Sequence, residues 1–410
     1  MSDAVSFLKY GDVAEFRNGL NFSKDSHGKG CKFIGVADFK DNFTPQWELL
    51  GEINPSGVAR KEDYLESGDI IFVRSNGNKS LVGRSLYIDR NEKSLYSGFC
   101  IRARLKKDDF LPLFLAYYTR TNFFKSAITS VAGTNINNLN QDILGNVMIP
   151  HYSIEIQKSI VDVLSSIDGK IAINNRINAE LEAMAKTLYD YWFVQFDFPD
   201  ANGKPYKTSG GKMEYNAMLK REIPAGWAVN TLSQIANITM GQSPAGESYN
   251  EDGIGTLFFQ GSTDFGWLFP TPRQYTTSPA RMAKKGDILL SVRAPVGDMN
   301  IANADCCIGR GLAALNSKSR SDGFLFYVMK YFKQVFDRRN AEGTTFGSMT
   351  KDDLHSLQVV CPEPGLLKRY DDIVSEYNKM IFTRSLENQD LIKLRDWLLP
   401  LLMNGQITVK

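Results

Sequence analysis

The side chains with the clearest capacity for chemistry lie in loops that follow short β-rich segments. The loop of residues 74–79, with Arg84 close behind it, offers arginine and asparagine side chains around a glycine. Such side chains make paired hydrogen bonds to the edges of guanine and adenine, and glycine lets a backbone approach a groove closely. The corresponding loop of residues 291–297 offers Arg293. These loops indicate binding to nucleic acid.

Two Gly-Thr turns add small hydrogen-bond donors, at residues 133–135 and 343–345. Donors of this kind commonly contact phosphate oxygens, which positions a protein on a duplex. Each of these loops also has a plain interpretation as a turn without a binding role. The residues that we predict to contact DNA are Arg74, Ser75, Asn76, Asn78, Lys79, Arg84, Thr134, Asn135, Arg293, Thr344 and Thr345.

Signatures of catalysis and of cofactor binding are missing from the sequence. It contains no P-loop, no G-x-S-x-G and no H-E-x-x-H motif. Gly309-Arg310-Gly311 fits a loose dinucleotide pattern, but the expected acidic residue about 20 positions later is absent, which favours a tight turn between strands. Three histidines and five cysteines without a C-x-x-C spacing predict no metal site and a reducing compartment. We therefore expect a binding protein that carries no cofactor.

The elements that position these loops occur twice along the chain. Gly68-Asp69-Ile70 recurs 218 residues later as Gly286-Asp287-Ile288, and Pro150 recurs 212 residues later as Pro362. Solenoid repeats have periods of about 20–50 residues, so a spacing this long indicates a duplicated domain. Two similar modules suit a ligand that is itself long and has two parts, as DNA does.

Charge is distributed unevenly although the net charge is only +2. Residues 60–107 contain 11 Lys/Arg against 6 Asp/Glu, and residues 281–339 contain 11 against 5, whereas residues 152–195 contain 4 against 6. Basic charge thus gathers outside the first helical segment, as phosphate contact requires. A solvated surface without a ligand remains the plain alternative. No apolar run of about 18 residues and no signal peptide are visible, which predicts a cytoplasmic protein with no membrane partner.

We predict an α/β (α+β) tandem in which two similar domains alternate with two long helices. Short β-rich runs separated by turn residues fill each domain, and a four–three spacing of apolar residues follows it. A segment rich in Gly, Pro and Lys lies between the halves. The predicted boundaries are 1–151 for the first domain, 152–195 for the first helix, 196–222 for the connector, 223–362 for the second domain, and 363–410 for the second helix and tail.

The heptad pattern predicts that the two helices pack on each other as an antiparallel coiled coil with pseudo-two-fold symmetry. Both seams are apolar at their ends and polar in the middle, and polar seam residues select register and partner. The alternative is that each helix only covers its own domain. The residues assigned to this packing are Ile160, Leu164, Ile167, Ile171, Asn174, Asn178, Leu181, Leu188, Ile373, Met380, Arg384, Leu391, Leu394 and Leu398.

A set of further motifs, in this order, resembles the DNA-specificity (S) subunits of type I restriction–modification systems. The second domain opens with Ile223-Pro224-x-Gly226-Trp227, and each domain contains Gly-Asp-Ile followed by Ile or Leu. The chain ends in Leu398-Leu399-Pro400-Leu401-Leu402-Met403-Asn404-Gly405-Gln406-Ile407, and Tyr191-Trp192-Phe193-x-x-Phe196 is similar to the family's central junction. The first domain departs from the pattern, because it lacks the Ile-Pro-x-Gly-Trp opening.

The resemblance implies a function without catalysis in this chain. Each domain would recognise one half of a bipartite, asymmetric site in double-stranded DNA, and the helices would fix the spacing between the halves. Two methyltransferase subunits, which bind S-adenosylmethionine and methylate adenine at N6, would dock on the helices. Motor–nuclease subunits would join for cleavage.

Three other interpretations stay open at the level of sequence. The chain could be a nuclease or methyltransferase whose motifs have diverged, and binding of S-adenosylmethionine or metal-dependent cleavage would reveal it. It could be a coiled-coil assembly scaffold, which predicts no salt-dependent affinity for DNA. It could also be the specificity protein of a different DNA-modification system, which the identity of its partner subunits would distinguish.

Overall fold

The computed structural model describes residues 6–40, 42–78, 81–132, 138–341 and 347–409. The chain forms two compact units, of which unit 1 comprises Met1–Ala172 with Gln389–Lys410 and unit 2 comprises Ile173–Asn388. The division passes through both long helices, whereas the sequence pattern separated domains from helices. Each unit therefore consists of a domain together with part of each helix. No helix in the described ranges has the length and apolar character needed to cross a membrane.

Unit 1 is built around a four-stranded antiparallel sheet in the order β2-β8-β5-β6. The central strand β5 is buried on both faces, as its run of apolar residues requires. A three-stranded sheet, β4-β3-β7, and the pair β1-β9 complete the β structure. The strands are β1 (Ser6–Lys9), β2 (Ala14–Asn18), β3 (His27–Ile34), β4 (Glu52–Ile53), β5 (Ile70–Val73), β6 (Ser85–Tyr87), β7 (Ser94–Tyr96), β8 (Cys100–Leu105) and β9 (Met148–His151).

Short helices cover the sheet of unit 1 and start where the sequence supplies a suitable residue. Pro112 occupies the first turn of α2, where its missing N–H costs nothing. The side chain of Asn140 accepts a hydrogen bond from the Ile143 N–H and so caps α4. The helices of the domain are α1 (Tyr10–Val13), α2 (Pro112–Tyr118), α3 (Asn122–Ala132) and α4 (Gln141–Gly145).

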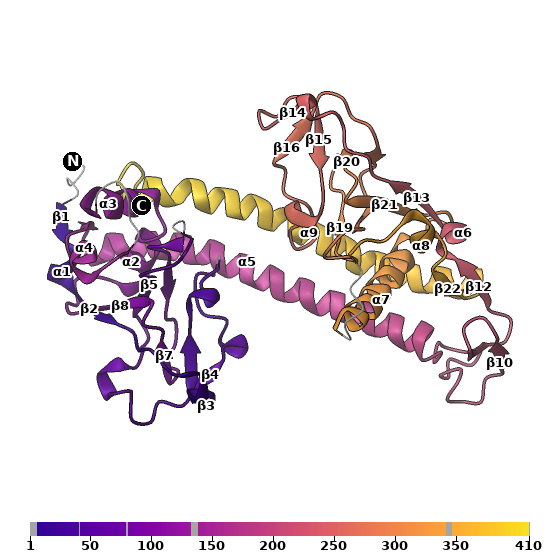
Figure 1. Ribbon diagram of the computed structural model, residues 1–410, viewed down its shortest axis with the longest axis horizontal. Coiled ribbons are helices and arrows are strands. Elements are labelled where there is room, and N and C mark those ends of the chain that lie inside the picture. The colour runs from indigo at the N-terminus through magenta and orange to yellow at the C-terminus, as the bar shows by residue number, and fades with distance from the viewer. Residues whose placement is uncertain (1–5, 41, 79–80, 133–137, 342–346, 410) are drawn as a thin grey trace. The chain divides into compact units, whose positions relative to one another are not determined.

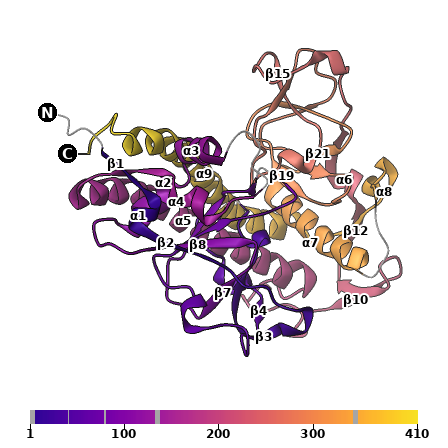
Figure 2. The same cartoon turned by 60° about the vertical axis from the view of Figure 1, so that its left-hand side comes forward.

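Unit 2 repeats this plan with a four-stranded sheet in the order β13-β21-β18-β19 and the pair β12-β22. Its second sheet has five strands, β14-β16-β15-β20-β17. Both views show the end of the unit that holds β15 lying away from α7 (Figures 1 and 2). The strands are β12 (Ala228–Thr231), β13 (Ala236–Met240), β14 (Tyr249–Asn250), β15 (Thr256–Phe259), β16 (Gln274–Thr276), β17 (Met282–Ala283), β18 (Ile288–Ser291), β19 (Met299–Ile301), β20 (Cys306–Ile308), β21 (Leu312–Ser317) and β22 (Gln358–Cys361).

One long helix, α7 (Asp322–Ala341), takes the place of α2 and α3 in unit 2. The short helices α6 (Leu232–Ile235) and α8 (Lys351–His355) correspond to α1 and α4. Thr350 caps α8 in the way that Asn140 caps α4. A hairpin of β10 (Met213–Asn216) and β11 (Arg221–Pro224) forms part of the connector. The predicted tandem of two similar domains is thus confirmed.

The repeated Gly-Asp-Ile sequence forms the turn that leads into the central strand of each sheet. Gly68 and Gly286 have φ of 96° and 95°, a conformation that favours glycine. The Asp69 carboxylate accepts a hydrogen bond from the Glu66 N–H, and the Asp287 carboxylate accepts one from the Lys284 N–H, both at 2.8 Å. The repeated motif is therefore a structural turn.

The long helices α5 (Ile154–Tyr189) and α9 (Pro364–Met403) run antiparallel within each unit. In unit 1 Arg395 bonds Asp168 at 2.9 Å, and the Tyr152 hydroxyl, just before α5, donates to the Met403 carbonyl. Figure 1 shows the last part of α9 beside the first part of α5 in this unit. Apolar side chains of both helices join the core of the unit, and they include Ile160, Leu164, Leu399 and Leu402.

In unit 2 the helices meet through a polar layer. Asn174 donates to Asn388 at 2.9 Å and to Glu387 at 2.8 Å, and Asn178 donates to Ser385 at 3.3 Å. Both asparagines are buried, as their assigned seam positions require. Of the other assigned residues in α5, Leu181 is buried, whereas Ile167, Ile171 and Leu188 are half-buried.

The assigned register of α9 is wrong by one residue along much of the helix. Ile373, Met380 and Leu394 are 38%, 39% and 42% exposed, whereas Val374 and Ile381 are buried. The polar layer uses Ser385 and Asn388 in place of Arg384, whose guanidinium donates to the Met380 carbonyl of its own helix. The error arises because α9 carries apolar residues on two neighbouring faces, so spacing alone does not choose between them. Leu391 and Leu398 are half-buried.

Candidate nucleic-acid interface

Three segments that are distant in sequence meet beyond the end of β5 in unit 1. The Arg74 N–H donates to the Phe99 carbonyl at 2.7 Å, and the Leu139 N–H donates to the Arg74 carbonyl at 2.8 Å. Arg74 thus joins the hairpin loop after β5, the turn between β7 and β8, and the segment that precedes α4. The backbone hydrogen bonds hold its Cα in place while its side chain stays half-buried.

The loop after Arg74 has its own internal order. The side-chain oxygen of Asn76 accepts a hydrogen bond from the Asn78 N–H at 2.8 Å, which forms an Asx-turn. Asn78 is exposed, whereas Ser75 and Asn76 are half-buried. Arg84 lies at the other end of the loop, and its guanidinium donates to the Lys40 carbonyl at 2.6 Å. Asn78 is thus the most exposed of the selected residues described in this loop, and the Arg84 guanidinium bonds the Lys40 carbonyl.

The same three segments meet in unit 2. The Val292 N–H donates to the Gly311 carbonyl at 3.0 Å, and the Met349 N–H donates to the Val292 carbonyl at 2.8 Å. Val292 therefore occupies the place of Arg74, and the next residue, Arg293, forms a β-bridge with Ser348. Arg293 is exposed, and no described side chain pairs with its guanidinium. The hairpin loop of unit 2 therefore carries its arginine one position later than Arg74 in unit 1, and no described side chain pairs with it.

The hairpin loops differ in length between the units. The Gly83 N–H donates to the Val73 carbonyl ten positions back, and the Gly297 N–H donates to the Ser291 carbonyl six positions back. Gly83 and Gly297 have φ of 83° and 93°, so the same glycine-dependent turn closes both loops. The four extra residues in unit 1 fall within the stretch that the sequence analysis selected.

Five of the residues predicted to contact DNA belong to stretches that the structure does not describe. Lys79, Thr134, Asn135, Thr344 and Thr345 lie outside the described residues. The described residues that follow them, Leu139 and Ser348, contact the two hairpin loops. Leu139 and Ser348 therefore lie at the same ends of the sheets as the arginine loops.

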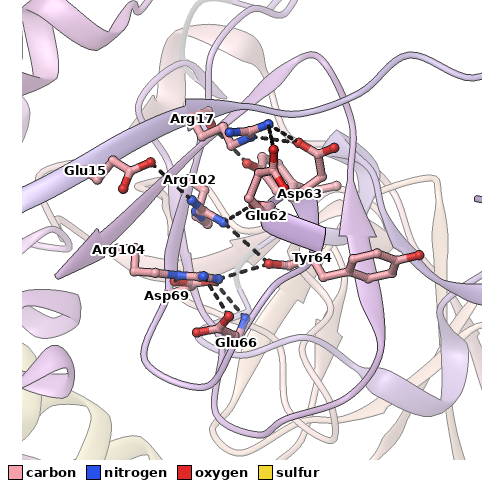
Figure 3. Close-up of polar contacts among 10 residues, drawn as sticks. Glu15, Arg17, Glu62, Asp63, Tyr64, Glu66, Asp69, Arg102 and Arg104 are labelled. Carbon is pink, nitrogen blue, oxygen red and sulfur yellow. Dashed lines mark hydrogen bonds and ion pairs between the residues drawn. The ribbon is translucent and has the colours of Figure 1, made fainter. Parts of the chain in front are cut away.

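Three arginines of unit 1 are engaged within the protein, and two of them, Arg102 and Arg104, belong to the basic stretch counted in the sequence (Figure 3). Arg104 forms two 2.7 Å hydrogen bonds with the Asp69 carboxylate, and Arg17 bonds Asp63 at 2.7 Å. Arg102 is 2% exposed and donates to the carbonyl of Glu62 at 2.9 Å. These arginines hold the segment of residues 60–69 against the sheet, so they are unavailable to a ligand.

The cysteines near the two sites are poor nucleophiles. Burial raises the pKa of the Cys100 thiol to about 12, and burial also raises the pKa of the Cys306 thiol to about 12. Both thiols stay protonated at neutral pH, whereas the thiolate is the reactive form. Among the described residues, no cluster of His, Cys, Asp or Glu has an arrangement suited to a metal ion. The geometry of the described sites is suited to binding.

The family profile of the type I restriction modification DNA specificity domain matches residues 3–183 and 224–379. The chain belongs to this family. The two matched segments cover both domains and extend into the long helices, in agreement with the duplication. The resemblance noted in the sequence is thereby confirmed.

Individual relatives of this family member align over nearly all of its length. One relative is a Methanocaldococcus jannaschii protein named as the specificity subunit of the MjaX type I restriction enzyme. It is 30% identical, with 97% of the chain and 92% of the relative covered. The HindI specificity subunit of Haemophilus influenzae is 23% identical, with 92% of the chain and 94% of the relative covered. The crystal structure of a type I restriction–modification S subunit from M. genitalium shares the fold, with a TM-score of 0.56, 16% identity, and coverage of 97% and 96%.

The turn between β7 and β8 was missed in the sequence of this family member. Its residue Phe99 is 57% exposed beside Arg74, although aromatic side chains are usually buried. The corresponding turn in unit 2 contains Arg310, which the sequence analysis noted only as part of a weak dinucleotide pattern. The signal that could have identified both turns is their position directly before β8 and β21, the partners of the Gly-Asp-Ile strands.

Proposed function

We propose that this chain is the DNA-recognition subunit of a type I restriction–modification complex, and that each unit binds one half of a bipartite target. The observation that carries this proposal is the meeting of three loops at equivalent ends of the two sheets in a member of the specificity family. The loops differ in length and in side chains, so two equal half-sites are not expected. The target should therefore be asymmetric.

The residues at these loops suit direct reading of bases. Arg74 and Asn78 in unit 1, and Arg293 in unit 2, offer forked donors or amides at the ends of rigid strands. Arginine pairs with the O6 and N7 atoms of guanine, and asparagine pairs with the N6 and N7 atoms of adenine. Thr134, Asn135, Thr344 and Thr345 remain proposed phosphate contacts from the sequence.

We also propose that the helices set the spacing between the half-sites and carry the partner subunits. In unit 1, Leu394 and Trp397 of α9 are 42% and 60% exposed, and in unit 2 Ile373 and Met380 are also exposed. Exposed apolar side chains along one element commonly mark a protein interface. Two methyltransferase subunits bearing S-adenosylmethionine, and motor–nuclease subunits for cleavage, are the proposed occupants. This chain itself would bind no cofactor.

The test is to express the chain with the methyltransferase subunit of its own genome in a host that lacks adenine methylation. N6-methyladenine is then mapped across the host DNA. We expect a gapped two-part motif that disappears when this chain is omitted. A stable complex that leaves the host DNA unmethylated, together with no salt-dependent DNA affinity of that complex, would instead support an assembly scaffold.

A further inference from the structure

The turn between β20 and β21 is tightly fixed and projects a single cationic side chain. The Gly309 N–H donates to the Phe259 carbonyl at 2.8 Å, and the Leu312 N–H donates to the Gly309 carbonyl at 3.0 Å. A Cβ atom on Gly309 would lie 2.9 Å from the Gln260 Cα, and one on Gly311 would lie 2.6 Å from the Gln260 carbonyl oxygen. Both flanking positions therefore require glycine, and Arg310 is the residue of this turn whose side chain can extend outward.

A polar support lies beneath Arg310. The Gln260 amide donates to the Ser243 hydroxyl at 2.9 Å, and the same hydroxyl oxygen lies 3.4 Å from the backbone nitrogen of Arg310. The support fixes the backbone and leaves the guanidinium exposed, with no hydrogen-bond or ion-pair partner among the described residues. A pre-positioned backbone with a free forked donor is what recognition of a base edge needs.

The backbones of two other exposed arginines border this turn. The Arg281 carbonyl accepts a hydrogen bond from the Ile308 N–H at 2.9 Å, so Arg281 borders the turn on one side. Arg293 borders it on the other, because the preceding residue Val292 bonds Gly311. Neither guanidinium has a partner among the described residues. Three arginines without a described anionic partner therefore belong to this turn and its borders, a charge that suits an anionic ligand such as DNA.

Unit 1 shows that the fold does not require a cation here. Its equivalent turn runs from Ser97 to Cys100, closed by the same pattern of hydrogen bonds, and Gly98 takes the place of Arg310. A Cβ atom on Gly98 would lie 2.3 Å from the side-chain oxygen of Asn21, which occupies the place of Ser243. The small Ser243 therefore accompanies the large Arg310, and the pair distinguishes unit 2 from unit 1.

We propose that Arg310 reads a guanine in the half-site bound by unit 2, through paired hydrogen bonds to the guanine O6 and N7 atoms. Arg281 flanks it on one side and contacts a phosphate, and Arg293 on the other side keeps the base-reading role proposed above. This inference rests on the proposed function. It adds a specificity-determining residue that lies outside the loops selected from the sequence, and it assigns a base identity to that residue.

The test uses the full chain in complex with its methyltransferase subunit, in the methylation-free host. Arg310→Ala and Arg310→Lys are compared with the unchanged chain by mapping N6-methyladenine in host DNA. Lysine keeps the charge but lacks the planar fork, so a phosphate contact would survive this change, whereas a guanine contact would be weakened. The control is Arg320→Ala, which removes an exposed arginine at the other end of β21.

We expect Arg310→Ala to lose discrimination at one guanine of the motif by about 10-fold to 100-fold and Arg310→Lys to lose part of it, while the other positions keep their preference. Arg320→Ala should leave the motif unchanged. The inference is overturned if Arg310→Ala keeps the original motif, or if it lowers methylation equally at all sites. If the unchanged chain directs no motif at all, the proposed function itself fails, so the two failures are distinguishable. Circular dichroism melting of each complex shows that the variants are folded.

Discussion

The central sheets of the two units hold the same backbone hydrogen bonds with different side-chain chemistry. In unit 1 Asp69 pairs with Arg104 of β8, and in unit 2 Asp287 accepts from Asn316 of β21 at 2.9 Å. The register of the strands makes Arg104 and Asn316 equivalent, because Ile70 pairs with Ala103 and Ile288 pairs with Leu315. Unit 1 therefore pairs the shared aspartate with an arginine, whereas unit 2 pairs it with an asparagine amide. The same strand pairing is therefore compatible with a charged side chain at this position in unit 1 and a neutral one in unit 2.

The contrast extends across the neighbouring strand. Arg17 lies opposite Arg102 in unit 1, whereas Thr239 lies opposite Ala314 in unit 2. Two arginines side by side are tolerated in unit 1 because carboxylates and carbonyls from residues 60–69 surround them (Figure 3). Unit 2 needs no such segment at this place, since it has no charge to neutralise. Removing these ionic contacts should therefore destabilise unit 1 more than removing the corresponding amide contacts destabilises unit 2.

The largest effect is expected from Arg102→Ala. The change removes a buried side chain, takes away its hydrogen bond to the Glu62 carbonyl, and creates a cavity, so unit 1 should lose about 3 kcal/mol of stability. Hydrogen exchange measured by mass spectrometry would locate the loss in residues 60–105. Ala314 already occupies the equivalent position in unit 2, so the comparison there is Thr239→Ala on the neighbouring strand, which should cost less than about 1 kcal/mol. Equal losses in the two units would show that the ionic contacts add little.

A smaller difference is expected from changing the shared aspartate. Asp69→Asn removes a charged partner of Arg104 and should destabilise unit 1 by about 2 kcal/mol, whereas Asp287→Asn faces a neutral amide and should cost about 1 kcal/mol. Urea unfolding followed by exchange in each unit measures both values. Added salt should reduce the first cost more than the second. A larger cost at Asp287 would contradict the assignment of ionic and neutral roles.

The smallest expected change in stability concerns the side chain that accepts a backbone hydrogen bond at the start of the helix covering each sheet. In unit 1 the Gln157 side chain accepts a hydrogen bond from the Leu111 N–H before α2, and in unit 2 Asp371 accepts from the Phe324 N–H in α7. Burial raises the pKa of Asp371 above its ordinary value, so folding favours its protonated form. The stabilising contribution is then present at low pH and is lost as pH rises through the raised pKa.

Asp371→Asn should therefore increase the stability of unit 2 near neutral pH and have little effect near pH 4, because asparagine keeps the acceptor without the charge. Melting temperatures at several pH values between about 4 and 7 test this expectation. Gln157→Glu is the reciprocal change in unit 1, and it should create the pH dependence that Asp371→Asn removes. A variant that shows the same gain at every pH would contradict the sign of the pKa shift.

Part of this structure was predictable from sequence because the signals were local or repeated. The duplication followed from Gly68-Asp69-Ile70 and its copy, and the long helices followed from their heptad spacing. The register of α9 was not predictable, since Val374 and Ile373 are both apolar and only packing in the folded chain distinguishes them. The charge of unit 1 was also misjudged, because Arg102 and Arg104 were counted as basic surface and are internal contacts.

The candidate sites depended on information that the sequence does not contain locally. Arg74 was identified because its residue type suits DNA, but its junction with Phe99 and Leu139 requires three distant segments to meet. Arg310 was not predicted to contact DNA, because its glycine neighbours fit an incomplete dinucleotide-binding pattern. Only the close approach of both glycines to Gln260 shows why they flank it.

The discontinuous make-up of unit 1 has a consequence for synthesis on the ribosome. Unit 2 is a single stretch of chain and can fold once Asn388 has emerged, but the core of unit 1 also needs Leu399 and Leu402. Until these arrive, the core that contains Ile160 and Leu164 lacks part of its packing. The half translated first is therefore completed last, and chaperones have the longest access to it during that interval.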